Sequence, residues 1–278
     1  MRTTAVDLQA DRPVAGGLSA ARLKRLSYLS LFWLTARESL RVGRLWSQTV
    51  VAPVVSSLLF VIVFGLSLGG RIRNVSGFDY QVFILPGLVA MGMLTAAYSN
   101  NSSSIFQARN DRYIDDILAA PMRAWQVDIG LTIGGVLRAL AIGIVLTAVA
   151  APLLGVPIEH PLLLVLAALA AILLFASLGV IVGIYAQTWD HNAFVQNLVI
   201  QPLTFVGGVF YSVDILPSPW HELSHANPLF YMVDGIRYGF LGTSDVAPAL
   251  AIAITVALAS AMFSWSVWLF RSGHKLKP

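Results

Sequence analysis

Residues 162–186 read LLLVLAALAAILLFASLGVIVGIYA and contain no charged side chain. A helix needs about 20 apolar residues to cross the hydrocarbon core of a bilayer, and this stretch is long enough. The rest of the chain has the same character: of 278 residues, 57% are hydrophobic and only 12% are charged, whereas an average soluble domain carries about 25% charged residues. The composition therefore excludes a soluble enzyme and predicts an all-α polytopic membrane protein.

Six segments are expected to form transmembrane helices. Five of them are strongly apolar and long enough to span. The remaining segment, 195–213, is the fifth in chain order. It is marginal because it contains Asn197, Gln201 and Pro202, yet its length suffices. The five apolar segments are 46–68, 81–103, 128–154, 162–186 and 247–270.

The transmembrane domain, 46–270, has shorter segments on either side. Residues 1–18 show no apolar periodicity and predict a disordered cytoplasmic tail, and 271–278 predict a second one. Residues 19–45 predict an amphipathic helix lying in the membrane interface, because apolar residues fall on one face at helical spacing and Lys and Arg interrupt the segment. The alternative is a solvated helix that packs on a partner protein. The apolar face comprises Leu26, Leu29, Trp33, Ala36 and Leu40.

The basic residues indicate the orientation of the chain. Fourteen of the 18 Lys and Arg lie in 1–45, 104–127 and 271–278, which fall on one side of a six-span topology. Cytoplasmic loops carry an excess of Lys and Arg, so both termini are expected in the cytoplasm. Arg138 lies inside the third span, where a charge is costly. It is expected to face protein or water, or to snorkel to the interface if the span begins later than residue 128.

No motif for catalysis or cofactor binding is present. The sequence has no G-x-x-x-x-G-K-[ST] phosphate loop, no H-E-x-x-H pair and no cysteine. His221 and His225 are four residues apart beside Glu222, and an interfacial polar face is favoured there over a metal site. Almost all carboxylates lie outside the spans, which argues against a proton-coupled transporter. The sequence thus predicts no catalytic, cofactor-binding or metal-binding residue, and no enzymatic activity of the chain itself.

The longest loop between spans on the cytoplasmic side contains a short helical segment, 107–121. An apolar centre with a charged rim is typical of a protein docking surface. A short helix resting on lipid headgroups is the alternative. The apolar centre comprises Tyr113, Ile114, Ile117 and Leu118, the rim comprises Arg109, Asp111, Arg112, Asp115 and Asp116, and Pro121 ends the helix.

The run from Arg109 to Met122, RNDRYIDDILAAPM, resembles the coupling segment of ABC-2 type permeases, the membrane subunits of bacterial exporters of drugs, lipids and polysaccharides. The C-terminal signature of that family, P-[apolar]-x-[HRSY]-x5-[RQ], is matched by Pro228, Tyr231 and Arg237. Pro217 fits the upstream spacing of the same signature. The resemblance covers roughly residues 30–270.

The resemblance implies a permease of the bacterial inner membrane that pairs with a second permease chain, most simply as a homodimer. Two separate ATPase subunits are implied, which bind ATP and Mg²⁺, and the cargo is expected to be an amphiphilic drug, lipid or glycan. Nucleic acid is not expected as a partner. A non-transporting scaffold or receptor, or a channel, is the alternative. The residues implied to couple to the ATPase are Arg109, Arg112, Tyr113, Ile114, Asp115, Asp116, Ile117, Leu118 and Pro121.

Polar and aromatic residues of the first and fifth spans are candidates for the translocation path, because the resemblance implies that these spans face the partner permease. The polar side chains alternatively hydrogen-bond a neighbouring helix, and the Phe side chains alternatively pack in the core. The polar run 99–104 predicts either a polar inner vestibule or a frayed helix end. The path candidates are Gln48, Ser56, Phe60, Phe64, Asn197, Gln201 and Phe205, with Phe210 nearby.

Residues 214–243 predict an external re-entrant hairpin made of two short helices. The stretch 228–243 is too short to cross and contains Asp234 and Arg237, which are three residues apart and can pair. Irregular backbone at membrane depth must rest on protein or water, so the hairpin is expected to pack on the spans and cap an exit. A plug that only stabilises the outer face is the alternative. Its signature residues are Pro217, Pro228, Tyr231, Asp234 and Arg237.

Overall fold

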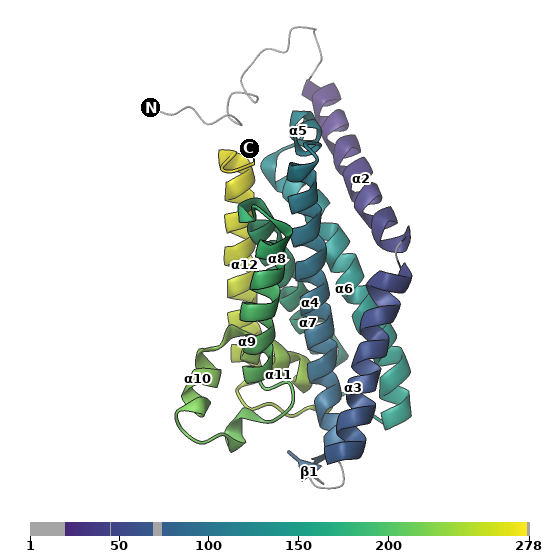
Figure 1. Ribbon diagram of the computed structural model, residues 1–278, viewed down its shortest axis with the longest axis vertical. Coiled ribbons are helices and arrows are strands. Elements are labelled where there is room, and N and C mark those ends of the chain that lie inside the picture. Colours follow the sequence, from purple (N-terminus) through teal and green to yellow (C-terminus); the bar gives the residue numbers. More distant parts are fainter. Residues whose placement is uncertain (1–19, 45, 69–73, 277–278) are drawn as a thin grey trace.

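The computed structural model describes residues 20–44, 46–68 and 74–276. Long helices run side by side along the long axis of the molecule, and short elements lie at its two ends (Figure 1). The long helices are α2 (Ala20–Arg44), η1 (Ser47–Val51) with α3 (Ala52–Leu68), α4 (Tyr80–Asn110), α6 (Ala124–Leu154), α7 (Pro161–Tyr185) and α12 (Pro248–Ser272).

The short elements define the two ends of the bundle. One end, called here the α5 end, carries α5 (Ile114–Ala119) and the turn that follows α12. The opposite end, called the β end, carries a small antiparallel sheet and three short helices (Figure 1). The elements of the β end are β1 (Asn74–Val75), β2 (Phe78–Asp79), η3 (Val213–Ile215), α10 (Trp220–Ala226) and α11 (Pro228–Leu241).

Five helical stretches among the described residues are long and apolar enough to cross a membrane: Ser47–Phe64, α4, α6, α7 and α12. They coincide with the five strongly apolar segments of the sequence. The all-α polytopic class is therefore confirmed. α7 begins with Pro161, whose fixed φ suits the first helical turn, and α6 ends at Gly155 with φ 65°.

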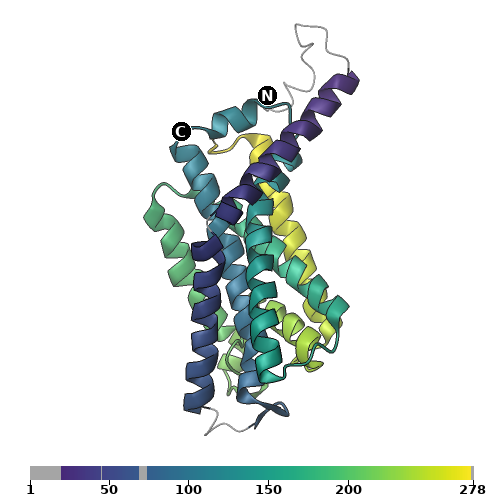
Figure 2. The ribbon, with the colours of Figure 1, turned by 90° about the vertical axis from the view of Figure 1, so that its right-hand side faces the viewer.

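In the marginal span expected at 195–213, the continuous helix ends at Val206, and three short helical segments follow one another without a break from Trp189 to that residue. They are α8 (Trp189–Phe194), the π-helix η2 (Val195–Ile200) and α9 (Gln201–Val206). This run descends from the α5 end towards the β end beside α4 (Figures 1 and 2). Three segments of six residues extend about 27 Å, somewhat less than the ~30 Å hydrocarbon core. Crossing by this run stays a prediction.

α2 lies obliquely across the upper part of the bundle and contacts α6 (Figure 2). Its inner face carries Leu34 and Val42, which are buried. The opposite face exposes Leu29 and Leu40, and Trp33 is 64% exposed. The apolar face that the sequence predicts therefore points away from the rest of the chain, as an interfacial helix requires. Residues 1–18, expected to form a tail, lie outside the described residues.

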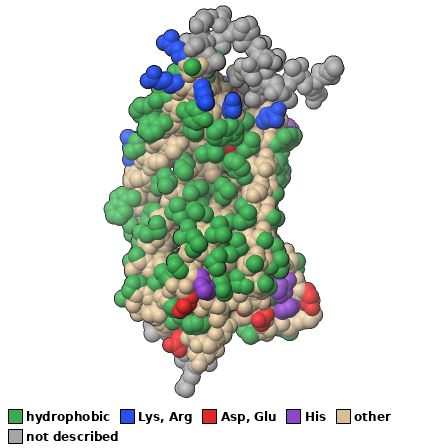
Figure 3. All heavy atoms as spheres, turned by 180° about the vertical axis from the view of Figure 1, so that it is seen from behind, with side chains coloured by type: hydrophobic (Ala, Val, Ile, Leu, Met, Phe, Trp, Pro, Cys, Tyr) green, Lys and Arg blue, Asp and Glu red, His purple; other side chains and the backbone are tan. Residues whose placement is uncertain are grey.

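On the surface seen from behind, apolar and charged side chains lie at different levels along the long axis of the molecule. Apolar side chains cover its middle, Lys and Arg gather at the α5 end, and Asp, Glu and His gather at the β end (Figure 3). A broad apolar band with charge only at its ends fits a protein surrounded by lipid. The charge asymmetry matches the one read from the sequence.

α10 and α11 occupy the place of the predicted hairpin. α11 contacts α4, α7 and α12 and is largely buried among them, as expected of an element resting on the spans. Its start is capped by Asn227, whose side chain accepts a hydrogen bond of 3.0 Å from the backbone N–H of Leu229. The two short helices are thus present, and their re-entry into the membrane stays a prediction.

Candidate functional site

The coupling segment, 107–121, turns its apolar residues into the bundle. Ile114 is 1% exposed and Ile117 is 8% exposed. Ile117 packs in a core cluster with Leu34 of α2 and Phe270 of α12, and Tyr113 and Leu118 lie at the edge of that cluster. The expectation that these residues form an exposed apolar docking surface is therefore wrong for Ile114 and Ile117, because the core of this chain already covers them.

The outer face of the coupling segment is charged instead. Exposed carboxylates outnumber the exposed basic residue Arg112, and Tyr113 is covered by the guanidinium of Arg37, 4.5 Å from the ring centroid. A partner that docks here meets a mostly acidic surface. Of the residues expected in the docking surface, the exposed ones are Asp111, Arg112, Asp115, Asp116 and Pro121.

Arg109 is not part of an exposed rim. Its Nη1 donates to the backbone carbonyls of Gly183 and Ala186, at 3.2 and 3.0 Å. These carbonyls belong to the last turn of α7 and its C-cap, where unpaired carbonyls favour a cation. Arg109 therefore joins the end of α4 to the end of α7, directly before the coupling helix.

A buried carboxylate on α2, which the sequence analysis missed, ties this helix to the bundle. Glu38 is 1% exposed, its Oε2 lies 2.9 Å from Arg41 Nη2, and it accepts a hydrogen bond of 3.2 Å from Ser104 Oγ of α4. Glu38 continues the inner stripe of Leu34 and Val42 at helical spacing. A single acidic residue in an otherwise apolar stripe was the available signal.

The polar run 99–104 forms neither a vestibule nor a frayed end. Asn101 is fully buried, its Nδ2 donates to the carbonyls of Thr132 and Ala176, and its Oδ1 accepts from the N–H of Gly135. These bonds join α4 to α6 and α7. Polar side chains can bridge helices in this way in lipid, where an unsatisfied polar group is costly.

Arg138 faces protein, one of the two expected arrangements. Its Nε donates to the backbone carbonyl of Thr49 at 3.2 Å. Thr49 lies in the π-helix η1. Single π-helical turns frequently occur at functional sites. The bond links α6 to η1, which directly precedes α3.

Four aromatic side chains from α3, from α9 and from the loop that follows α9 meet in one group, called here the aromatic seam: Phe60, Phe64, Phe205 and Phe210. The ring centroids of Phe64 and Phe210 lie 5.4 Å apart, and those of Phe205 and Phe210 also lie 5.4 Å apart. Phe60 contacts both Phe64 and Phe210. The first and the expected fifth span therefore meet through Phe210, and Phe60 and Phe205 keep an exposed edge.

The polar path candidates all face outward. Asn197 and Gln201, four residues apart on η2 and α9, are exposed, and so are Gln48 and Ser56 on the η1–α3 helix. They lie among exposed apolar residues such as Leu198. The structure thus places these side chains away from the core of the chain, where they do not bond a neighbouring helix of the same copy.

Asp234 and Arg237 do not form the direct ion pair that we expected. Among the described residues the one salt bridge joins Arg41 to Glu38. Asp234 accepts instead from the backbone N–H groups of Asp245 and Val246, at 2.9 and 3.3 Å. Burial raises the pKa of Asp234 to about 6, although these bonds and the nearby Arg237 favour its charged form.

Arg237 is almost fully buried and joins α11 to two other elements. Its Nη2 donates to the carbonyl of Gly208, and its guanidinium lies 4.2 Å from the centroid of the Phe83 ring on α4. The backbone of the same loop rests on α4, because a Cβ added at Gly87 would meet the carbonyl of Val209 at 2.5 Å.

The remaining signature residues shape the β end. Pro228 begins α11 and Pro217 lies between η3 and α10, where its carbonyl accepts from the N–H of Trp220 at 3.0 Å. Tyr231 donates to the carbonyl of His225 at 2.9 Å and so joins α11 to α10. The Nε2 atoms of His221 and His225 lie 3.2 Å apart, but no group of three potential metal ligands occurs in the described part of the chain.

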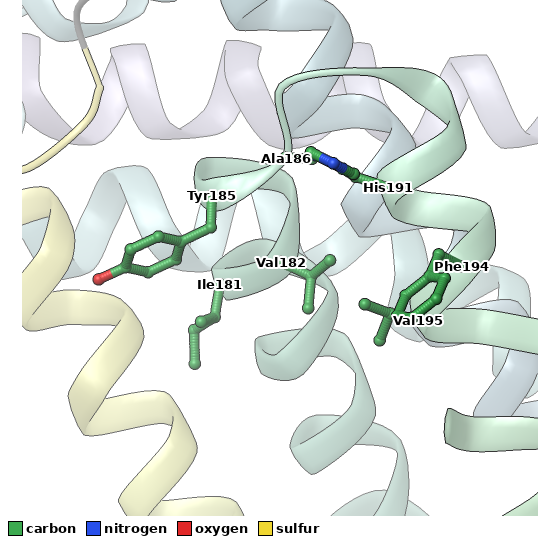
Figure 4. Close-up of a pocket in the computed structure, with 7 residues that line it drawn as sticks. All are labelled: Ile181, Val182, Tyr185, Ala186, His191, Phe194 and Val195. Atoms are coloured by element: carbon green, nitrogen blue, oxygen red, sulfur yellow. The ribbon is translucent and has the colours of Figure 1, made fainter. Parts of the chain in front are cut away.

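A shallow cleft of about 270 Å³ lies at the α5 end of the bundle (Figure 4). Its lining is mostly apolar and comes from the end of α7 and from α8 and η2. The residues are Ile181, Val182, Tyr185, Ala186, His191, Phe194 and Val195.

Comparison with known proteins matches the resemblance read from the sequence. Residues 30–241 match the family of ABC-2 type transporters. The chain is 38% identical over 257 residues to the inner membrane transport permease YadH of Escherichia coli K12, covering 92% of this chain and 100% of the relative. It is 27% identical over 233 residues to nodulation protein J of Rhizobium leguminosarum bv. viciae, covering 82% and 84% of the two chains. The chain therefore belongs to the ABC-2 type transporter family and is a multi-pass transmembrane permease subunit of an ABC transporter, whose ATPase is a separate subunit.

Proposed function

We propose that this permease exports an amphiphilic drug, lipid or glycan across the bacterial inner membrane, as a homodimer driven by two ATPase subunits. ATP and Mg²⁺ are bound by those subunits. The similarity to a relative named inner membrane transport permease supports the transport role. The aromatic seam, in which Phe60 and Phe205 are exposed, suits the apolar part of such a cargo.

The observation that carries the proposal is the position of Asn197 and Gln201. Both amides are exposed on a helical run that lies beside the spans. Amides are costly to expose to hydrocarbon, so a second copy or a polar path is the environment that satisfies them. With the aromatic seam, which joins the same run to α3, this face offers both polar and apolar contacts to a moving amphiphile.

The ATPase subunits are assigned to the α5 end. The exposed carboxylates of the coupling segment supply a charged contact, and the buried Ile117 connects that contact to the core. A push on α5 is thus transmitted to α2, α7 and α12 through shared packing. The basic residues at this end support a cytoplasmic location, and the hairpin of α10 and α11 then lies at the external exit.

Co-purification followed by transport tests the proposal. The tagged chain, co-expressed with a candidate ABC ATPase from the same organism, is expected to bring that ATPase down, and the reconstituted complex is expected to hydrolyse ATP. Inverted membrane vesicles should take up an amphiphilic dye only with ATP, and a phosphate-loop Lys→Ala variant of the ATPase should abolish uptake. A chain that never associates with an ATPase contradicts the proposal, as does dye uptake that continues without ATP.

A further inference from the structure

The loop 207–213 carries Phe210 into the aromatic seam, and each end of this loop is held by a charged side chain, the buried Arg237 at one end and the half-buried Asp245 at the other. At the first end, Arg237 donates to the carbonyl of Gly208, which has φ 77°. This left-handed turn directs the carbonyl towards α11. Val209, the next residue, is fully buried with its backbone against Gly87 of α4.

At the other end, Asp245 holds the loop with both carboxylate oxygens. Its Oδ1 accepts from Ser212 Oγ and its Oδ2 accepts from the N–H of Val213, both at 2.8 Å. Asp245 is itself fixed by α11, because its backbone N–H donates to Asp234 at 2.9 Å. A chain of bonds therefore runs from α11 through Asp245 to the loop.

The two holding points depend on one another through charge. Nε and Nη1 of Arg237 have no hydrogen-bond partner among the described residues. Burial lowers the pKa of Arg237, and the carboxylates of Asp245 and, to a smaller extent, Asp234 raise it again. Removal of the charge of Asp245 thus weakens the loop contact at Ser212 and Val213 and also leaves a buried guanidinium less compensated.

We infer that Asp245 is a positioning residue, which acts with Arg237 to hold the loop 207–213 so that Phe210 closes the seam between α3 and α9. Asp245 lies after Arg237, the last residue of the family's C-terminal signature. Phe210 is the ring whose position depends on this loop, and it contacts every other ring of the seam. The closing of a path rests on the proposed export function, whereas the position of Phe210 does not.

A fluorine probe tests the position directly. 4-Fluorophenylalanine placed at 210 in the purified chain in nanodiscs is expected to give one fluorine NMR line that is shifted by the neighbouring rings. In Asp245→Ala, the chemical shift of this line should change towards the value found in the unfolded chain, by more than half of the difference between the folded parent and the unfolded chain. Asp214→Ala removes an exposed carboxylate of the same loop region and should leave the line unchanged.

A labelling rate gives a second, independent reading in the same nanodiscs. The chain has no cysteine, so Val213→Cys, at a fully buried position, is labelled by a maleimide only when the loop lifts. Asp245→Ala should raise that rate at least tenfold, and Asp245→Asn, which keeps one acceptor, should raise it less. If Asp245→Ala does not fold, Asp245→Asn and Ser212→Ala take its place. Unchanged lines and rates in variants of normal thermal stability overturn the inference.

The ATPase rate of the complete transporter tests whether Asp245 acts through the position of Phe210. Asp245→Ala and Phe210→Ala should change the basal rate by the same factor, and the double variant should change it no further. Independent effects that multiply overturn the action through Phe210. A parent complex without ATPase activity contradicts the proposed function instead, and the fluorine and labelling results still decide the position of the loop.

Discussion

Glu38 is held by groups from two helices inside an otherwise apolar face. A buried carboxylate is tolerated only when it is paired and hydrogen-bonded, and Arg41 and Ser104 supply these contacts. Asn101 and Arg138 likewise satisfy their polar atoms on the backbone of neighbouring helices. At the residue scale, polar side chains thus fix helix positions at the α5 end.

Replacement of Glu38 by Ala should destabilise the chain by about 1–3 kcal/mol, because Arg41 and Ser104 lose their acceptor. Glu38→Gln keeps an acceptor and should cost less. Thermal unfolding in detergent measures both effects. Glu222→Ala removes an exposed carboxylate of α10 and serves as the control, which should unfold like the parent. Equal stability of Glu38→Ala and Glu222→Ala would contradict the anchoring role.

Replacement of Gly87 by Ala should push the loop 207–213 away from α4, because the new Cβ would meet the carbonyl of Val209 at 2.5 Å. A clash of this kind costs about 1–3 kcal/mol, which thermal unfolding detects. Gly43→Ala is the matched control, since nothing lies within 4 Å of its added Cβ. The control should be neutral or stabilising; a neutral Gly87→Ala would disprove the close packing.

At the element scale, α5 combines a buried apolar side with an exposed acidic side. Ile114 and Ile117 are core residues, whereas Asp115 and Asp116 are available to a partner. Charges at the rim of an interface mainly set specificity and association rate. The ATPase contact is therefore expected to be sensitive to salt.

Charge reversal on α5 separates docking from folding. The double variant Asp115→Lys and Asp116→Lys should weaken binding of the ATPase subunit at least tenfold at low salt while its thermal unfolding stays like that of the parent. Ile114→Asp should instead lower stability, because it buries an unpaired charge. Binding is measured by titration of the purified permease with the ATPase.

Asp214→Lys is the control for this experiment, because it reverses an exposed charge at the opposite end of the molecule. It should bind the ATPase normally. Normal binding by the α5 double variant would show that the acidic side is not the docking surface.

The sequence predicted some elements well and others only in part. α7 was predictable because an uninterrupted apolar run of that length has few alternatives. For α5 the same apolar residues suit either a docking surface or a core, and a six-residue helix shows no periodicity that decides between them. Asp245 was missed because its bonds reach Ser212 and Val213, more than thirty residues away, and no local pattern records such a contact.

At the scale of the whole molecule, the membrane topology depends on which helices cross the bilayer. α10 and α11 lie at the β end, and α11 rests on α4, α7 and α12. If α8, η2 and α9 cross together as the fifth span, both α10 and the segment after α11 stay on the same side. By the excess of Lys and Arg at the α5 end, that side is expected to be the exterior.

Cysteine labelling of intact cells tests this topology. Ser218→Cys and Ser244→Cys should both react with an impermeant maleimide from outside, and Asn110→Cys at the α5 end should react only after the membrane is opened. Ser244→Cys that is labelled solely from the cytoplasm would show that α11 crosses the membrane.

The central claim is that the face formed by α3, η2 and α9 meets a second copy around the path. Disulfide cross-linking of single-cysteine variants in native membranes measures it most directly. Gln201→Cys and Asn197→Cys are expected to form covalent dimers on oxidation, with yields that change when the ATPase binds ATP. Ile144→Cys, which is 65% exposed on α6, should stay monomeric. Dimers through Ile144→Cys, together with none through Asn197→Cys or Gln201→Cys, would contradict the account.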